Sequence, residues 1–563
     1  MRRGVIRLGD QIKDVWFRDI TSKIPPVSTA SYIVYTDGSK YYAKNGDTGV
    51  VEYSDADVAK VIQYAVDRVV ASGGGKIFIR RGVYNAYSQV WIKSAGRPVR
   101  VVIEGEGGAT GLAEESATRI IFRNLPLTNE NSSTAVRVGY RYDDSGNEVS
   151  NWYSNGVKIK IRDLSIHCYD TRLRGLVIEG SSDRFDLVNV GIYGCAYGLV
   201  LRGMAEATIG GRITGCNISG GYRDVNGISG AALQLGDIVQ RKVIANGVAN
   251  LLIDNIGLLN IGYPPQNMTA TQGDLASLRP SALRLIQGNR ITVVNSHLHL
   301  GGWGWGYGLH LWGSQASNTQ PITTSSSPYP GGNIEIYGTN FEGGAPTNPD
   351  GSVANVDNIF ILQETDTEWI NVRESYFFGN SSVRMLFSSR RGRLRIENSR
   401  VFHLYGSVEF VTYYSGARLL ADGFGYVKNM ELFLISGTIL SVSSYIYYDD
   451  ESCDARFSTY SGSRGNPATL PTSKILLYGN TMYYKLPAGT SVSAGVNTYN
   501  AHHAYAVDVN HLPDFRIQLL QTTPELIFMG AMMNTSLPGF VLYFYAPSAT
   551  TTSKDVLIKI KYG

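Results

Sequence analysis

The stretch SALRLIQGNRITVVNSHLHLGGWGWGYGLHLWG, from Ser281 to Gly313, holds one complete structural repeat and the start of the next. Leu283 and Leu285 form an apolar pair two residues apart, and a second pair begins at Ile291 and leads to Asn. Leu309 then starts the first pattern again, 26 residues after Leu283. Alternation with a period of two predicts strands, and Asn predicts a corner between them. The stretch therefore predicts a strand, a corner, a second strand and a return to the same face.

This first strand type recurs along the middle of the chain. Its apolar pairs lie at Leu176/Ile178, Leu199/Leu201, Leu233/Leu235, Leu283/Leu285, Leu309/Leu311, Ile359/Ile361, Val383/Met385 and Val408/Phe410. A second type, an apolar pair followed by Asn, Asp, Gly or Glu, falls between them at 159–163, 185–189, 251–255, 291–295, 334–338, 370–374 and 394–398. Two interleaved ladders with a basic turn of about 24 residues and three insertions predict a solenoid of parallel strands. We expect the Asn corners to form an internal stack of hydrogen-bonded amides.

Composition agrees with a large all-β protein. The chain has 563 residues, 63 of them Gly, which suits corners that need positive φ. The net charge of +4 is small, and no run of Lys and Arg accompanies it, so we expect no nucleic-acid partner. The N-terminus lacks the apolar core of a signal peptide, and no stretch of 18 consecutive apolar residues occurs. We therefore expect neither a signal peptide nor a membrane span.

Three of the four cysteines end strands of similar type. Cys168, Cys195 and Cys216 are separated by about one turn of the solenoid, which predicts a column of small buried side chains on successive coils. A disulfide within that column is the alternative. The spacing does not resemble a zinc site, and we expect no metal and no cofactor.

The residues before the repeat are expected to attach the chain to a particle and to cover the open end of the solenoid. Residues 1–30 have no evident core and are interpreted as an attachment segment that contacts other proteins of a particle. Residues 31–75 are interpreted as a head with one helix over 55–72, which Asp55 or Asp57 can cap and which the glycines that follow can end. A single amphipathic helix at this place most simply covers the open end of the solenoid.

The rest of the chain divides into two further regions. Residues 76–430 carry the repeat. Residues 431–563 contain separate alternating strands joined by Ser, Thr, Gly and Pro loops without the repeat, which predicts a C-terminal β-sandwich.

The segment VIQYAVDRVVASGG, followed by KIFIRRGVY and by coils such as VNVGIYGCAYGLVL, resembles the pectate-lyase-like right-handed parallel β-helix superfamily. The run ASYIVYTDGSKYYAKNGDTGVVEYSD looks like the head of viral β-helix spikes, the tailspike or receptor-binding proteins. The resemblance implies a right-handed parallel β-helix, and a C-terminal domain that caps it and holds a homotrimer together or contacts sugars. The superfamily contains lyases, hydrolases and non-catalytic adhesins, so the resemblance leaves the activity open.

The strongest candidate for ligand binding lies on the outer face of the first ladder. Alternation directs Arg284, His310 and Trp312 outward on adjacent coils, beside the GGWGWGYG loop. That loop contributes three further aromatic side chains, those of Trp303, Trp305 and Tyr307. Aromatic faces stack on sugar rings, while Arg and His bond hydroxyls or carboxylates. The alternative is that these aromatics pack against a neighbouring subunit or beneath an insertion loop.

Hydrolysis of a glycosidic bond needs two carboxylates, about 5 to 5.5 Å apart for retention of configuration or about 6.5 to 9.5 Å for inversion. Glu364 and Asp366 lie two residues apart after the Ile359 strand, and such residues have Cα atoms about 6.6 to 6.8 Å apart. They are the first candidate catalytic pair. Asp237 and Glu342, from other coils, are the further candidates that one of them could pair with. The alternative is a solvated acidic corner. The clustered Asp residues of calcium-dependent lyases are not evident, so a lyase is less favoured.

Three functional hypotheses follow. The first is a spike on the surface of a virion, made without a signal peptide, that binds host surface polysaccharide and cleaves it as a glycoside hydrolase. The second is an adhesin or structural spike with the same surface and no turnover. The third, a secreted enzyme of cellular origin, is disfavoured by the N-terminus. A homotrimer suits the first two, because side-to-side packing stabilises a thin solenoid and three sites give avidity.

Overall fold

The computed structural model describes most of the chain from residue 29 onward. The described ranges are 29–94, 96–107, 117–150, 152, 156–180, 185–203, 211–239, 242–244, 248–261, 280–286, 288–301, 306–311, 333–344, 358–363, 370–379, 384–388, 394–397, 399–405, 407–411, 414–415, 418–419, 425–428, 431–436, 446–448, 458–459, 476–478, 481–486, 488–502, 515–534, 539–554 and 556–562.

Two long sheets built mainly from parallel strands run side by side along the chain. The larger sheet, called here the 25-stranded sheet, consists of β1 (Tyr32–Thr36), β2 (Tyr41–Asn45), β3 (Val51–Asp55), β4 (Gly74–Ile79), β5 (Gly82–Ala86), β7 (Val99–Glu104), β8 (Thr118–Phe122), β10 (Val157–Cys168), β12 (Asp186–Tyr193), β14 (Arg212–Thr214), β15 (Asn217–Gly220), β19 (Val248–Asp254), β20 (Gly257–Asn260), β22 (Gly288–Val294), β23 (His297–His299), β25 (Ile334–Tyr337), β26 (Asn340–Glu342), β28 (Ile370–Arg373), β29 (Tyr376–Gly379), β31 (Leu394–Glu397), β32 (Arg400–Tyr405), β36 (Gly425–Lys428), β37 (Glu431–Ser436), β38 (Ile446–Tyr448) and β39 (Ser458–Thr459) in the described ranges.

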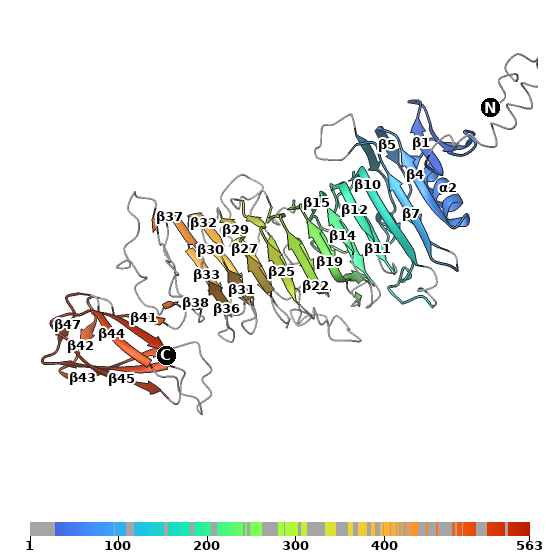
Figure 1. Cartoon of the computed structure of the whole chain (residues 1–563). Helices are drawn as coiled ribbons and strands as arrows, with labels where there is room; N and C mark the ends of the chain where they lie inside the picture. Colours follow the sequence, from blue (N-terminus) through green and yellow to red (C-terminus); the bar gives the residue numbers. More distant parts are fainter. Residues whose placement is uncertain are drawn as a thin grey trace, which may run out of the picture.

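The second sheet, called here the ten-stranded sheet, consists of β6 (Val90–Ile92), β9 (Thr134–Val138), β11 (Arg174–Glu179), β13 (Tyr197–Arg202), β16 (Ala231–Leu235), β21 (Ser281–Leu285), β24 (Tyr307–Leu311), β27 (Asn358–Gln363), β30 (Arg384–Ser388) and β33 (Ser407–Val411) where the structure describes it. Two short antiparallel hairpins leave it: β17 (Asp237–Val239) with β18 (Lys242–Ile244), and β34 (Tyr414–Ser415) with β35 (Arg418–Leu419). The coils are stacked along one axis, from β4 and β7 to β33 and β36 (Figure 1). This arrangement is a parallel β-helix, as the repeat predicts.

Stacked apolar columns form the core between the two sheets. In the ten-stranded sheet Leu199 pairs with Leu233, Leu233 with Leu283, and Leu283 with Leu309, and all four side chains are buried. In the 25-stranded sheet an equivalent column runs through Ile161, Leu187, Ile213, Ile253, Val293, Ile336, Val372 and Ile396. Each coil therefore buries its apolar face against the coils before and after it.

The predicted register fails at β27 and at the next two strands of the ten-stranded sheet, where Ile359 pairs with Leu386 and Met385 with Val408. The sequence pattern aligned Ile359 with Leu309, but Leu309 pairs with Ile361, and β27 meets β30 through a register shift at this point. The physical reason is that four consecutive apolar residues occupy 359–362 and all are buried, so alternation gives no signal there. Phe360 consequently packs in the core instead of pointing outward as predicted, and Leu362 takes the place beside His310.

The corners after the second strand type adopt the left-handed conformation. Asp163, Asn189, Asn255, Asn295 and Glu374 have φ of 57°, 54°, 52°, 49° and 48°. Asn and Asp tolerate this region better than other non-Gly residues, which explains why they recur there. The predicted internal amide stack is wrong, however, because the side chains of Asn255 and Asn295 are exposed. Only Asn189 and Asp163 are joined by a bond, Nδ2 to Oδ1 at 2.9 Å, among the corners described.

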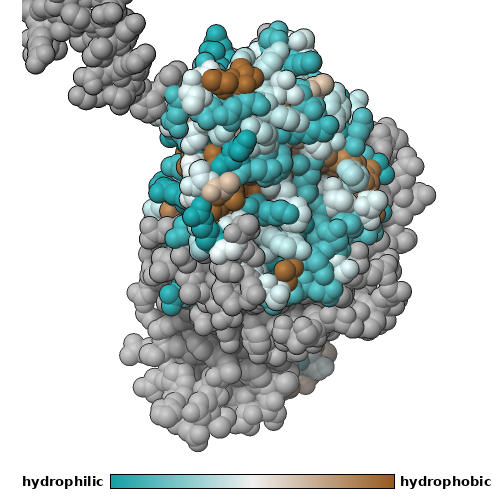
Figure 2. Space-filling model, turned by 90° about the vertical axis from the view of Figure 1, so that its right-hand side faces the viewer, coloured by the Kyte–Doolittle hydropathy of each residue, from teal (hydrophilic) through white to brown (hydrophobic). Residues whose placement is uncertain are grey.

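Helix α2 (Val58–Ala71) covers the N-terminal end of the β-helix (Figure 1). Asp57 caps it: Oδ1 accepts from the Ala59 amide, and the same carboxylate accepts from the Tyr87 amide and the Ser88 hydroxyl. The buried face of α2 carries Val58, Ala59, Val61, Ile62, Ala65, Val66 and Val69. Viewed toward this end, the described surface is mainly hydrophilic with small separate apolar patches (Figure 2). The helix thus closes the core, as predicted.

The predicted start of the C-terminal region at residue 431 is too early. Strand β37 pairs in parallel with β32, and β38 and β39 continue the same sheet, so the β-helix extends to at least Thr459. From β40 (Leu476–Tyr478) onward, the described strands pair only antiparallel. One sheet contains β40, β41 (Thr481–Leu486), β48 (Val556–Tyr562) and β44 (Phe515–Gln521), and others contain β43 (Gly495–His502), β46 (Gly539–Ala546), β45 (Ile527–Asn534), β42 (Ser491–Val492) and β47 (Thr550–Thr551).

The three cysteines of the predicted column are buried free thiols, so the disulfide alternative does not hold for them. The side chains of Cys168 and Cys195 are in hydrogen-bond contact. Burial and this contact raise the pKa of the Cys168 thiol, which keeps it protonated. Across the described part of the chain, no helix is long and apolar enough to cross a membrane.

The left-handed corners give a direct test of the fold. Replacing Asn295 by Val places a β-branched residue at φ 49°, and we expect a loss of about 1–2 kcal/mol in the free energy of unfolding, while Asn295→Gly is tolerated. Chemical denaturation measures the difference. Asn340→Val, on an exposed position of strand β26, is the matched control and should be near neutral. Equal stability of the two Asn295 variants would contradict a left-handed backbone conformation at residue 295.

Candidate functional site on the ten-stranded sheet

The outer face of the ten-stranded sheet gathers charged and aromatic side chains from consecutive coils. Register pairs join Trp91 to Arg137, Arg137 to Val177, Val177 to Val200, Val200 to Gln234, Gln234 to Arg284, Arg284 to His310 and His310 to Leu362. A neighbouring column contains Glu179 and Arg202, which are also register partners. These side chains point away from the apolar core and are nevertheless mostly buried.

A chain of alternating charges lies on this face. Arg174 Nη1 donates to Asp237 Oδ2 at 2.5 Å, and Arg202 Nη1 donates to the same oxygen at 2.6 Å. Arg202 Nε reaches Glu179 Oε2 at 2.9 Å, and Arg137 Nε reaches Glu179 Oε1 at 2.6 Å. All five side chains are at most 2% exposed. Buried charges of this kind are stable only when each is paired and hydrogen-bonded, as these are.

Two hairpins that project from the coils cover the charge chain. They share the pattern Gly-Tyr-Arg followed by Asp and a later Gly, at Gly139–Glu148 and at Gly221–Ser229. In each, the Asp carboxylate accepts from backbone amides two and four residues later: Asp143 from Ser145 and Asn147, and Asp224 from Asn226 and Ile228. The same local chemistry therefore builds the same turn twice.

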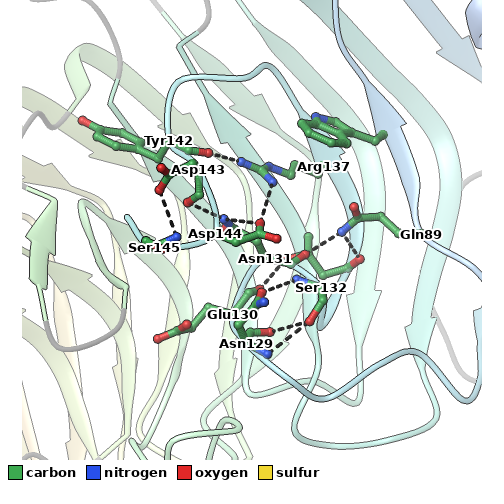
Figure 3. Close-up of polar contacts among 12 residues, drawn as sticks. Gln89, Asn129, Glu130, Asn131, Ser132, Arg137, Tyr142, Asp143, Asp144 and Ser145 are labelled. Carbon is green, nitrogen blue, oxygen red and sulfur yellow. Dashed lines mark hydrogen bonds and ion pairs between the residues drawn. The ribbon is translucent and has the colours of Figure 1, made fainter. Parts of the chain in front are cut away.

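Arg137 links the buried charges to the first hairpin. Its Nη2 donates to the Tyr142 carbonyl at 2.6 Å, and its Nη1 lies 3.9 Å from Asp144 Oδ1. Asn131 donates from Nδ2 to the Asp143 carbonyl and to Asp144 Oδ1, and Gln89 donates to the carbonyls of Asn131 and Thr134 (Figure 3). The charge chain thus ends at Asp144, which is 69% exposed.

Aromatic rings and cations border the exposed edge of this site. Trp91 is half-buried and donates from its indole nitrogen to the Gly139 carbonyl at 2.8 Å. Lys93 Nζ lies 4.2 Å and Arg137 Cζ 4.6 Å from its ring centre, and the Tyr140 ring meets it edge-on at 5.1 Å. Arg141 lies over the ring of Trp152 at 3.8 Å. We call the surface formed by Trp91, Lys93, Tyr140, Asp144 and Glu148 the rim.

Asp237 and Glu342, named as catalytic partners from the sequence, lie apart. Asp237 is fully buried in the charge chain, where its oxygens accept from Arg174, Arg202 and Gln234. That environment suits an ion-pairing role. Glu342 belongs to β26 of the other sheet and lies 3.0 Å from His297 Nε2. The two carboxylates therefore do not face each other across one groove.

Arg284, Tyr307 and His310, predicted as outward ligand-binding residues, lie together but are buried. The Tyr307 and His310 ring centres are 4.5 Å apart, and His310 is the register partner of Arg284. Arg284 Nη1 donates to the Ser229 carbonyl of the second hairpin at 2.8 Å. All three side chains are buried, with Tyr307 packed on Ile359 and Leu362. Trp303, Trp305, Trp312, Glu364 and Asp366 lie outside the described residues.

Sequence reasoning missed the rim. Trp91 lies in a strand of three residues, too short for the periodic pattern that located the later coils. Asp143 and Asp144 lie outside the repeat, where one orders the turn and the other lies 3.9 Å from Arg137. The signal that could have marked the two hairpins as equivalent is Gly-Tyr-Arg followed by Asp, which occurs in both. Among the residues that the structure describes, no group of three His, Cys, Asp or Glu side chains could hold a metal ion.

Comparison with known proteins gives similarity at the level of structure. No protein-family model matches the chain, and no curated protein sequence matches it. A mutant tailspike protein of the E. coli bacteriophage HK620, in complex with a hexasaccharide, is 12% identical; the match covers 98% of this chain and 100% of that one, with a TM-score of 0.37. The HK620 tailspike in complex with a pentasaccharide is also 12% identical, over 97% of this chain and 100% of that one, with a TM-score of 0.30. Similarity of this size assigns no role to any side chain.

Asp224 of the second hairpin lies beside the charge chain, and its pKa is raised. Burial raises the pKa of Asp224 above its ordinary value of 3.8, while Arg174, 3.9 Å away, opposes the shift. Glu130, which lies nearby, adds to it. The folded state therefore holds this proton more tightly than the unfolded state does, so the associated stability is present below pH 3.8 and is lost as the pH rises through the folded pKa.

The direction of this pKa shift predicts how the stability of an Asp224 variant changes with pH relative to wild type. Asp224→Asn keeps the Oδ1 acceptor of the turn and cannot ionise, so its melting temperature should rise relative to wild type as the pH increases from about 4 to about 7. Thermal unfolding at several pH values measures the gap. Asp143→Asn, at the equivalent turn of the other hairpin, is the control. A gap that stays constant with pH would show that Asp224 does not carry the effect.

The charge chain gives a second prediction. Glu179→Gln removes the charge that two buried guanidinium groups share, and we expect a loss of about 3–5 kcal/mol in the free energy of unfolding. Glu148→Gln, in the first hairpin and 47% exposed, should cost less than about 1 kcal/mol. Urea denaturation followed by tryptophan fluorescence compares the two. Similar losses for both variants would rule out a special role of the buried chain.

Proposed function

We propose that this chain is a spike protein on the surface of a virus-like particle and that it binds host surface polysaccharide through the outer face of the ten-stranded sheet. The observation that carries the proposal is the rim, where Trp91 and Tyr140 lie beside Lys93, Asp144 and Glu148. Aromatic rings provide apolar faces for sugar rings, and the charged groups bond hydroxyls. Such a combination suits a saccharide better than an apolar ligand or a nucleic acid.

The rim is held in place before any ligand arrives. The Trp91 indole is oriented by its bond to the Gly139 carbonyl, and the hairpin that carries Asp144 is tied to Arg137. Arg141, from the same hairpin, bonds Glu148 through Nε at 2.9 Å. Groups fixed in this way lose little conformational entropy when a ligand binds, which favours affinity. The rigid stack of coils beneath supports the whole surface.

The carboxylates that the structure describes favour binding of the polysaccharide without cleavage. Glu179 and Asp237 accept bonds from buried guanidinium groups and are fully buried, so neither can reach a glycosidic oxygen. Asp144 and Glu148 are accessible, but each contacts an arginine. Both accessible carboxylates of the rim are thus already ion-paired within the protein.

We extend the proposal to cleavage of the glycan, with Glu364 and Asp366 as the catalytic pair. Its support is the sequence: two carboxylates two residues apart follow β27, the strand that pairs with the one carrying Tyr307 and His310. We further propose attachment to other virion proteins through residues 1–30 and assembly as a homotrimer. Three copies would raise the avidity for a repetitive polysaccharide without any new contact.

Substitution at the rim tests the binding site. Trp91→Ala with Tyr140→Ala should weaken binding to polysaccharide extracted from a susceptible host by about tenfold or more, because stacking on both rings is lost. Tyr337→Ala, an exposed tyrosine on the other sheet, should bind like wild type. Biolayer interferometry on immobilised polysaccharide gives the affinities, and thermal unfolding confirms that the variants fold.

The same preparations decide whether the spike cleaves. Chain length and reducing ends are followed after incubation with the polysaccharide, for wild type and for Glu364→Gln. Shortening by wild type that Glu364→Gln abolishes would establish a hydrolase with that residue in its mechanism. Binding with no shortening would leave an adhesin. Unchanged binding by the double rim variant would refute the proposed surface.

A further inference from the structure

The 25-stranded sheet carries a short ladder of aromatic and cationic residues where β5, β8 and β10 end. Strands β5, β8 and β10 pair in parallel, with Ala86 beside Phe122 and Phe122 beside Cys168. The residues that follow directly are Tyr87, Arg123 and Tyr169. Backbone bonds continue the pairing to this level, from the Arg123 amide to the Ala86 carbonyl at 2.7 Å and from the Tyr169 amide to the Phe122 carbonyl at 2.9 Å. The three side chains therefore start about 4.8 Å apart on consecutive coils.

The guanidinium group in the middle is oriented and accessible. Arg123 Cζ lies 4.4 Å from the centre of the Tyr169 ring, and Nε donates to Asn85 Oδ1 at 3.0 Å. These contacts fix its plane. Tyr169 is 68% exposed and Tyr87 46% exposed, so an aromatic ring is available on each side of the cation. The Tyr87 amide is bonded to Asp57 at the start of α2, which fixes the backbone of the first member.

The surroundings of Arg123 contain no competing anion. Within the described ranges, no carboxylate forms an ion pair with Arg123, and the nearby Asp170 is paired with Arg172 at 2.7 Å. His167, two residues before Tyr169, is 7% exposed, and burial together with Arg119 lowers its pKa to about 4. It is therefore neutral at physiological pH and adds no charge to the patch. The patch presents a positive charge between two rings.

We infer that Tyr87, Arg123 and Tyr169 form a second saccharide-binding site, selective for sugars that carry a carboxylate. A planar guanidinium matches a carboxylate with two parallel bonds, and tyrosine faces stack on the apolar face of the sugar ring. The inference takes from the proposed function only that the ligand is a saccharide. The site itself lies on the 25-stranded sheet and shares no residue with the rim.

The test uses the full chain and two defined probes that carry carboxylates, an oligogalacturonate and an oligomer of sialic acid, with the carboxyl-reduced form of the first as the neutral control. Isothermal titration calorimetry should show binding of at least one acidic probe and weaker binding of the neutral one. Arg123→Gln should lower that affinity about tenfold or more, since a charge-assisted bidentate contact is lost. Tyr169→Ala should lower it several-fold, and raising the salt concentration should weaken binding.

Two further variants separate this site from the rim. Arg100→Gln, which removes an exposed arginine of β7 in the same sheet, should bind the acidic probe like wild type. The double variant Trp91→Ala, Tyr140→Ala should also bind it like wild type, even where it no longer binds host polysaccharide. The inference is overturned if neither acidic probe binds, if the neutral probe binds equally well, or if Arg123→Gln has no effect while its thermal unfolding matches wild type.

Discussion

The structure depends on the parallel pairing of each coil with the next. No coil can bury its own apolar side chains, so columns such as Leu199, Leu233, Leu283 and Leu309 exist only through register between neighbours. Because the inward columns satisfy the hydrophobic requirement alone, the outward positions are released for charges and aromatic rings. Both surfaces discussed above, the rim and the Tyr87 ladder, are made of such released positions on opposite sheets.

The released positions differ in how they are covered. On the ten-stranded sheet two hairpins exclude water from arginines and carboxylates, which then satisfy one another almost completely. On the 25-stranded sheet near β5, β8 and β10 no such pairing of Arg123 with a carboxylate occurs in the described ranges. A buried ion chain gives rigidity and specificity of docking more than net stability. An uncovered cation between tyrosines is free to meet a ligand.

The features of the fold that follow repeating or local sequence patterns could be predicted from the sequence. The offset between Leu283 and Leu309, the corner at Asn295 and the cap at Asp57 all follow from local patterns, and the structure confirms them. The register at 359–362 could not be predicted, because four adjacent apolar residues remove the alternation. Nor could the ion chain, since its partners, such as Arg174 and Asp237, are brought together by a hairpin whose docking depends on tertiary contacts.

The paired hairpins have a consequence for how this protein can change over generations. Each turn is ordered by its own aspartate. Each hairpin docks on polar groups, the first on Arg137 and Asn131 and the second on Glu130 and Arg284. Exchange of the residues at a hairpin tip, such as Ser145 or Asn226, leaves the inward columns untouched. The scaffold can therefore remain constant while the tips drift, so that descendants with one architecture could present different surfaces at this place.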